Sequence, residues 1–147
     1  MEEYDLLPDE FFKNKKINLL QEEINDKINN FIFPLEIKNY KYFEEYINFL
    51  KLKIIANILF GCDNLTPSKS INLIWLEHIR NKTNYTKFNE LFNNYENFKY
   101  IKYNYHNNIF NTIYFYKKIL RFDPLQVAWN DDNNEMKLNL SHEIVYY

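Results

Sequence analysis

The chain has 147 residues, the length of one ordinary domain, and can bury about two-thirds of the surface that its unfolded form exposes. Hydrophobic residues make up 46% of the chain and charged residues 26%, a balance that favours folding over disorder. Because the formal net charge is -2, the chain lacks the basic excess of most nucleic-acid-binding proteins, and nucleic acid is not the leading partner.

The residue usage favours helices. The chain contains 13 Phe, 13 Tyr and 2 Trp but only one Gly, whereas the tight hairpins of many-stranded folds usually need glycine. We therefore predict an all-α protein: a single compact domain over residues 1–147, with five or six helices, an aromatic-rich core, and either a short strand or an extended tail at the C-terminus. The abundance of Asn, Ile, Lys and Tyr is typical of an AT-rich genome, such as that of a large DNA virus or a protist.

Two amphipathic helices are predicted in the first part of the chain. Apolar residues recur at steps of three and four over residues 17–31, and Pro34 should end this first helix. A second stripe of this kind covers residues 43–58, and Gly61 should terminate it.

Capping residues mark the next two helices. Thr66 followed by Pro67 predicts a helix start, and Thr83 predicts another. The residues expected to face inward are Ile71, Ile74, Trp75 and His78 in the first of these helices, and Tyr85, Phe88, Leu91 and Phe92 in the second.

The last third should contain an aromatic connector, two helices and a tail. The connector covers residues 100–106, and one helix covers residues 112–120. Asp123 and Pro124 repeat the cap-then-proline pattern and predict a short helix ending near Trp129. In the tail, residues 131–147, a polar loop precedes Met136, Leu138 and Leu140, which alternate as in a strand.

The segment LTPSKSINLIWLEHIRNKTNY, residues 65–85, resembles the signature of the glycine-rich domain-containing-protein family. That signature has a proline, then an aspartate, a Trp-His-x-His motif and a later tyrosine. Pro67, Trp75, His78 and Tyr85 match this pattern.

The resemblance covers roughly residues 41–130, and it includes His106 in a histidine-containing turn and Trp129 after a proline step. The chain departs from the signature at two positions: Leu76 replaces the first histidine and Asn72 replaces the aspartate. The resemblance implies a helical fold and an association with stress or regulatory proteins, and it implies no particular reaction.

His78 and His106 are the candidate metal ligands, with Glu77 or Asp63 as carboxylate partners, because imidazole and carboxylate groups suit zinc or iron. A helical zinc site usually offers His-x-x-x-His, which this chain lacks, so a hydrogen-bonded structural histidine is the favoured interpretation. The alternative function is a degenerate metal-dependent enzyme centred on these two histidines.

Two other groups could support chemistry. Cys62 beside a histidine could act as a nucleophile, although a lone cysteine after an apolar helix is more often a small buried side chain. The acidic cluster Asp131, Asp132 and Glu135 lacks the glycine and regular spacing of a calcium loop, and a solvated turn is the better interpretation.

Two aromatic features remain. Lys99 and Lys102 alternate with Tyr100, Tyr103 and Tyr105, a pattern compatible with a weak single-stranded nucleic-acid binder, which is the third hypothesis. Trp75 and Trp129 could anchor a partner, although burial in the core is favoured for both.

The compartment and partner follow from absences in the sequence. Cys62 is the one cysteine, the N-terminus lacks the pattern of a secretory signal, and residues 54–62 are too short to cross a bilayer. We therefore expect an intracellular protein, in the cytoplasm or, if viral, in the host cytoplasm or the virion. The leading hypothesis is a non-catalytic protein-interaction or structural module that needs no cofactor and whose partner is another protein.

Overall fold

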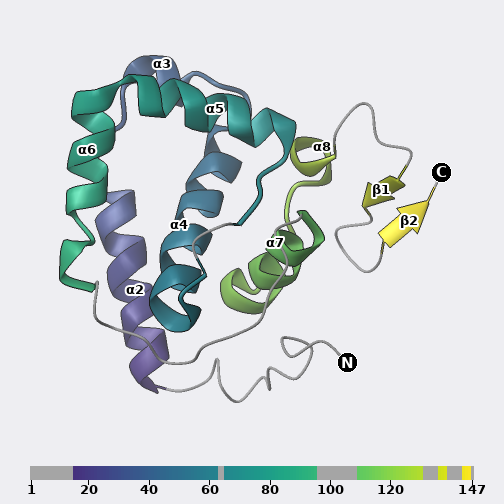
Figure 1. The fold of residues 1–147 in the computed structure, drawn as a ribbon, viewed down its shortest axis with the longest axis horizontal. Helices are drawn as coiled ribbons and strands as arrows, with labels where there is room; N and C mark the ends of the chain where they lie inside the picture. Colours follow the sequence, from purple (N-terminus) through teal and green to yellow (C-terminus); the bar gives the residue numbers. More distant parts are fainter. Residues whose placement is uncertain (1–14, 63–64, 96–108, 131–135, 139–143, 147) are drawn as a thin grey trace.

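The structure is a computed structural model that describes residues 15–62, 65–95, 109–130, 136–138 and 144–146. These ranges are mostly helical, which confirms the predicted fold class (Figure 1). They contain seven α-helices, more than the five or six predicted, and two of these, α3 and α8, are only four residues long. The elements are α2 (Lys15–Asn29), α3 (Leu35–Lys38), α4 (Phe43–Phe60), α5 (Lys69–Arg80), α6 (Lys82–Glu90), the 3-10 turn η2 (Asn93–Tyr95), α7 (Ile109–Phe115), the π-helical segment η3 (Tyr116–Leu120), α8 (Gln126–Trp129), and strands β1 (Met136–Leu138) and β2 (Ile144–Tyr146).

Helix α2 has the apolar stripe that the sequence predicts. Its buried residues are Ile17, Leu20, Ile24 and Ile28. Phe31 belongs to the same spacing but lies beyond the helix end, where it is half-buried. Helix α3 is not predicted by the sequence, because a single turn is too short to show helical periodicity.

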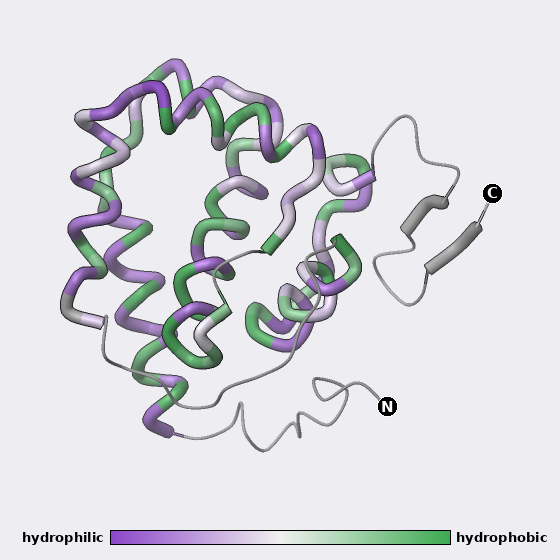
Figure 2. Tube along the Cα trace, viewed as in Figure 1, coloured by the Kyte–Doolittle hydropathy of each residue, from purple (hydrophilic) through white to green (hydrophobic). Residues whose placement is uncertain are grey.

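Helix α4 is the central helix of the fold and packs against α2, α5 and η3. The prediction of a single apolar stripe is wrong for this helix, because Phe49, Leu52 and Ala56 are also fully buried. Figure 2 shows hydrophobic residues recurring along its length, between α2 and α7. Gly61 ends the helix as predicted, with a left-handed φ of 70° and its N–H donating to the Asn57 carbonyl at 2.9 Å.

The predicted caps of α5 and α6 are both wrong by a few residues. Ser68, and not Thr66, caps α5, and its hydroxyl accepts from the N–H of Ile71. The N–H of Thr66 instead donates to the Thr112 hydroxyl at 2.8 Å, which ties this loop to α7. The cap of α6 is Asn81, whose side chain replaces the predicted Thr83. In both places the residue used, Ser or Asn, is a stronger N-cap than the predicted threonine.

The inward faces of α5 and α6 are smaller than predicted. In α5, Ile71, Ile74 and His78 are buried and Trp75 is half-buried. In α6, Phe88 is the buried residue. Tyr85, Leu91 and Phe92, which were also expected to face inward, are half-buried.

The C-terminal elements agree with the prediction in outline. The expected helix over residues 112–120 is divided into α7 and the π-helical η3. The short helix α8 begins at Gln126, and the predicted start at Asp123 and Pro124 is wrong, because Leu125 is the N-cap residue. The N–H of Leu125 donates to the Glu45 carboxylate. Strand β1 contains the predicted Met136 and Leu138, and it pairs with β2 in antiparallel register. Leu140, the polar loop 131–135 and the connector 100–106 lie outside the described residues.

The core is aromatic, as predicted. Its largest fully buried side chains include Trp129, Tyr46, Tyr116, Phe49, Phe60, Phe88 and Phe115. None of the helices in the described ranges is both long enough and apolar enough to span a bilayer.

Candidate functional site

His78 is the centre of a buried hydrogen-bonded chain. Its side chain is fully buried, its Nδ1 lies 2.6 Å from the Tyr46 hydroxyl, and its Nε2 lies 2.7 Å from Asn84 Oδ1. The Asn84 amide in turn donates to the backbone carbonyl of Ile32 at 2.9 Å. This chain of hydrogen bonds therefore connects α4, α5, α6 and the turn that follows α2.

The carbonyl of Ile32 fixes the direction of both hydrogen bonds that Asn84 makes. A carbonyl only accepts, so the Asn84 nitrogen must face it and the Asn84 oxygen must face His78. His78 Nε2 therefore carries a hydrogen, and in the neutral imidazole Nδ1 accepts from the Tyr46 hydroxyl. A neutral imidazole satisfies all of these contacts, which supports the interpretation of His78 as a structural histidine.

Burial keeps both titratable groups of this hydrogen-bonded chain, His78 and Tyr46, neutral. Burial lowers the pKa of His78, and the bond to Asn84 offsets the shift only in part. Burial also raises the pKa of Tyr46 far above its usual range, and Tyr85 adds to this effect. The rings of Phe33, Tyr85 and Phe88 pack around the imidazole, with ring centroids 5.3, 5.0 and 5.9 Å from that of His78.

The depressed pKa of His78 predicts acid destabilisation. The unfolded chain takes up a proton near pH 6.5, whereas the folded chain resists until a lower pH, so the free energy of unfolding should fall from pH 7 toward the folded pKa. Chemical denaturation at pH 7.5 and pH 5.5 measures this change. A His78→Phe variant is the control, because it keeps every other titratable group. An equal pH dependence in the two proteins would show that His78 does not cause it.

The structure brings three of the four matched signature residues together. The Trp75 indole donates to the Tyr85 hydroxyl at 3.0 Å, and the Tyr85 ring packs on His78. Pro67 and Asn72 are half-buried on the approach to α5 and on α5 itself. Leu76 is 43% exposed while His78 is buried, so these two positions face in different directions.

The two tryptophans differ in environment. Trp129 is fully buried, with ring centroids 5.8 Å from Tyr116 and 6.2 Å from Phe49, which confirms core burial for this residue. Trp75 is half-buried, and its ring centroid lies 5.4 Å from that of Phe49. The Lys53 ammonium lies 5.0 Å from the centroid of the Trp75 ring. Phe49 therefore contacts both indoles. His106, the remaining residue of the family resemblance, lies outside the described residues.

The described ranges hold no group of three or more His, Cys, Asp or Glu side chains placed to bind a metal ion. Both nitrogens of His78 contact protein atoms, Cys62 is fully buried, and Glu77 pairs with Arg80 at 2.9 Å. The other sequence-predicted groups lie outside the described residues: Asp63, Lys99, Tyr100, Lys102, Tyr103, Tyr105, His106, Asp131, Asp132 and Glu135. The zinc or iron site therefore stays a hypothesis.

A buried carboxylate forms a second polar cluster. Glu45 is only 6% exposed, and its Oε2 accepts from the Tyr116 hydroxyl at 2.6 Å and from Asn48 Nδ2 at 3.2 Å. Its Oε1 accepts from the N–H of Leu125 at 2.5 Å. Burial, together with Glu45, raises the pKa of Tyr116 far above its usual range. This cluster connects α4 to η3 and to the start of α8.

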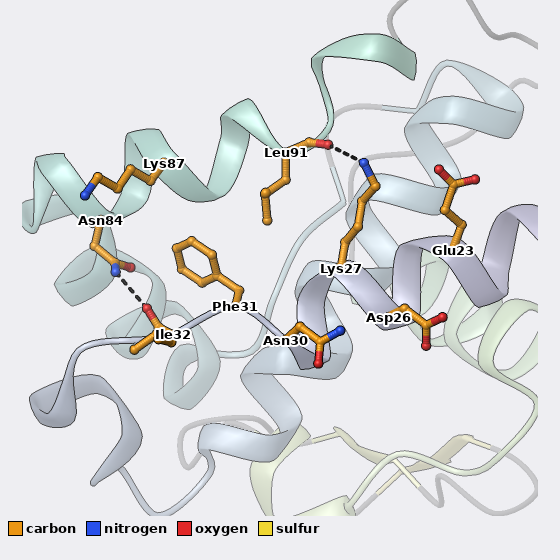
Figure 3. Close-up of a pocket in the computed structure, with 9 residues that line it drawn as sticks. All are labelled: Glu23, Asp26, Lys27, Asn30, Phe31, Ile32, Asn84, Lys87 and Leu91. Atoms are coloured by element: carbon orange, nitrogen blue, oxygen red, sulfur yellow. Dashed lines mark hydrogen bonds between the residues drawn. The ribbon is translucent and has the colours of Figure 1, made fainter.

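A groove of about 720 Å³ lies between α2 and α6. Figure 3 shows the Phe31 ring and the Leu91 side chain in the space between the two helices. Ile32, at the mouth of this groove, is 81% exposed, more than any other large hydrophobic residue of the described ranges. The lining residues are Glu23, Asp26, Lys27, Asn30, Phe31, Ile32, Asn84, Lys87 and Leu91.

Two hydrogen bonds connect the walls of this α2–α6 groove. The Lys27 ammonium donates to the Leu91 carbonyl at 3.1 Å, and Asn84 donates to Ile32 (Figure 3). Asn84 belongs both to the groove and to the His78 chain, so the groove wall is attached to the core. A smaller pocket of about 220 Å³ shares Phe31 with the groove and also contacts α4.

Sequence reasoning missed Tyr46, Asn84, Glu45 and the groove. Glu45 carried a weak signal, because a carboxylate stands among the apolar residues of α4. Asn84 carried none, since the chain is rich in asparagine and six residues separate it from His78. The groove depends on how α6 lies beside α2, which no local pattern reports.

The comparisons with known proteins do not assign a family. No protein-family model matches the chain, and no curated protein and no solved structure matches it. The resemblance to the glycine-rich domain-containing-protein family therefore rests on the quoted residues and stays a hypothesis.

Proposed function

We propose that the protein is a helical protein-interaction module and that the α2–α6 groove is its binding surface. The observation that carries the proposal is the apolar strip in this groove, formed by the exposed Ile32 and the half-buried Phe31 and Leu91. An isoleucine that is 81% exposed adds little to the stability of the core. Its burial by a partner would contribute favourably to the free energy of binding.

The shape and polarity of the groove favour a macromolecular partner. Small-molecule sites usually enclose most of their ligand, but Glu23, Asp26, Asn30 and Lys87 are exposed around this groove. An apolar centre with a charged and amide rim is typical of a protein interface. A protein partner therefore fits the groove better than a small ligand does.

The groove is also held in shape before anything binds. The bonds from Lys27 to Leu91 and from Asn84 to Ile32 connect its two walls. Asn84 is further fixed by His78, which is buried. A surface that is already ordered loses less conformational entropy on binding, which favours measurable affinity from a small contact area.

Replacing Ile32 with aspartate should remove partner binding while leaving the fold intact. The substitution adds a charge to the apolar strip, so affinity should fall about tenfold or more. The measurement is quantitative affinity capture of tagged wild-type and variant protein from the native cellular context, compared partner by partner. Leu73→Asp is the matched control, because Leu73 is 62% exposed and lies on α5, outside the groove.

The two variants give opposite expectations. A specific partner retained by wild type and Leu73→Asp but lost by Ile32→Asp supports the groove. A partner that is lost only from Leu73→Asp would move the interface to α5, and retention of every partner by Ile32→Asp would refute the proposed function.

A further inference from the structure

Both walls of the α2–α6 groove are two helical turns long. The lining residues run from position 23 on α2 to position 30 just beyond its end, and from position 84 on α6 to its C-cap at position 91. On each wall they recur at steps of three and four, which places them on one face. Seven residues of helix extend about 10 Å, so the groove matches two turns of a third helix.

The two walls carry opposite net charge. Glu23 and Asp26 lie on the α2 wall, and Lys87 lies on the α6 wall. Lys27 adds one positive charge to the α2 wall, where its ammonium donates to the Leu91 carbonyl and lies 5.4 Å from the centroid of a tyrosine ring, so the net charge of this wall stays negative. Within the described part of the chain, no ion pair engages Glu23, Asp26 or Lys87. Glu23 does interact with Tyr95: burial raises the pKa of Tyr95 above its usual range, and Glu23 adds to this effect.

The groove offers little to the backbone of an extended peptide. Such a peptide needs partners for its own N–H and C=O groups, but both walls are helices and neither provides a strand edge. The amide of Asn84 is already bonded to His78 and to Ile32. A helix satisfies its own backbone groups and needs only side-chain contacts.

We infer that the α2–α6 groove binds an amphipathic helix of a partner protein, with basic side chains along one edge and acidic side chains along the other. Its apolar ridge covers Phe31, Ile32 and Leu91, its basic edge lies along α2, and its acidic edge lies along Lys87. The inference rests on the proposed function, because it names the class of partner that the same groove accepts.

Selection from two displayed peptide libraries against the full chain tests this inference. In the first library, leucines at every third and fourth position form a ridge, and the flanking edge positions vary among Lys, Glu and Gln. The second library has the same composition with prolines that prevent a helix. The helical library should be enriched in members with Lys on one edge and Glu on the other, in either chain direction.

Charge reversal then tests the contact itself. Selected peptides should bind about tenfold more weakly to a Glu23→Lys, Asp26→Lys double variant, since two favourable pairs become repulsive. A Glu22→Lys, Glu36→Lys double variant makes the same change of net charge at exposed sites outside the groove, and it should bind the peptides nearly as well as wild type.

The outcomes separate this inference from the proposed function. Three outcomes would overturn the inference of a helical partner with one basic and one acidic edge. They are enrichment of the proline library, enrichment of helical peptides that lack the Lys and Glu edges, and an equal loss of binding in both double variants. If neither library is enriched while Ile32→Asp still abolishes capture of a partner, the partner class is wrong and the groove stands. If Ile32→Asp changes nothing, the proposed function itself fails.

Discussion

Replacing His78 with alanine should lower the free energy of unfolding by about 3–5 kcal/mol. The substitution opens a cavity among aromatic rings and leaves the Tyr46 hydroxyl and the Asn84 oxygen without their partner. The Asn84 amide would also lose the contact that orients it toward Ile32. The loss should therefore affect both the core and the shape of the groove.

Urea denaturation followed by circular dichroism measures this effect. The matched control is Leu76→Ala on the same helix, which should change stability by no more than about 0.5 kcal/mol because Leu76 is partly exposed. If His78→Ala cost no more than Leu76→Ala, the hydrogen-bonded chain would not be a stabilising feature of the fold.

Replacing Glu45 with leucine should cost about 3 kcal/mol of stability. Leucine fills much of the same volume, but the Tyr116 hydroxyl and the Leu125 N–H would lose their acceptor. The Asn48 amide would lose one of its two acceptors and keep its bond to the Tyr116 hydroxyl at 3.0 Å. Each of these donors is held near the carboxylate by a different part of the chain. Their loss should loosen η3 and the start of α8 relative to α4.

The control for this variant is Glu44→Leu, one residue earlier on α4, where the side chain is exposed. Denaturation of both variants and of Tyr116→Phe completes the measurement. Combining Glu45→Leu with Tyr116→Phe should cost less than the sum of the single changes, because both remove the same bond. Strict additivity would contradict a direct contribution from this bond.

Local patterns in the sequence were enough to predict the helical class and most of the helices. The spacing of Ile17, Leu20 and Ile24 reports one buried face, and Gly61 reports a left-handed helix end. The patterns failed where several nearby residues could cap the same helix. Ser68 caps α5 because its hydroxyl also donates to the Ala128 carbonyl at 2.6 Å, which ties α5 to α8.

The candidate site was predictable only in part. Trp75, His78 and Tyr85 were singled out together, and they are in contact. The partners that define the role of His78 come from 32 residues earlier and six residues later, in different helices. The groove depends on the placement of α6 beside α2, so its apolar strip becomes visible only in the folded chain.

Site-specific photo-crosslinking tests the interaction groove most directly. A photoreactive phenylalanine analogue at position 32, inside the groove, is compared with the same analogue at position 73, on the exposed face of α5. The groove proposal predicts that position 32 crosslinks to a defined segment of a partner protein and that position 73 does not. Crosslinks from position 73 alone would contradict the proposal and place the interface on α5.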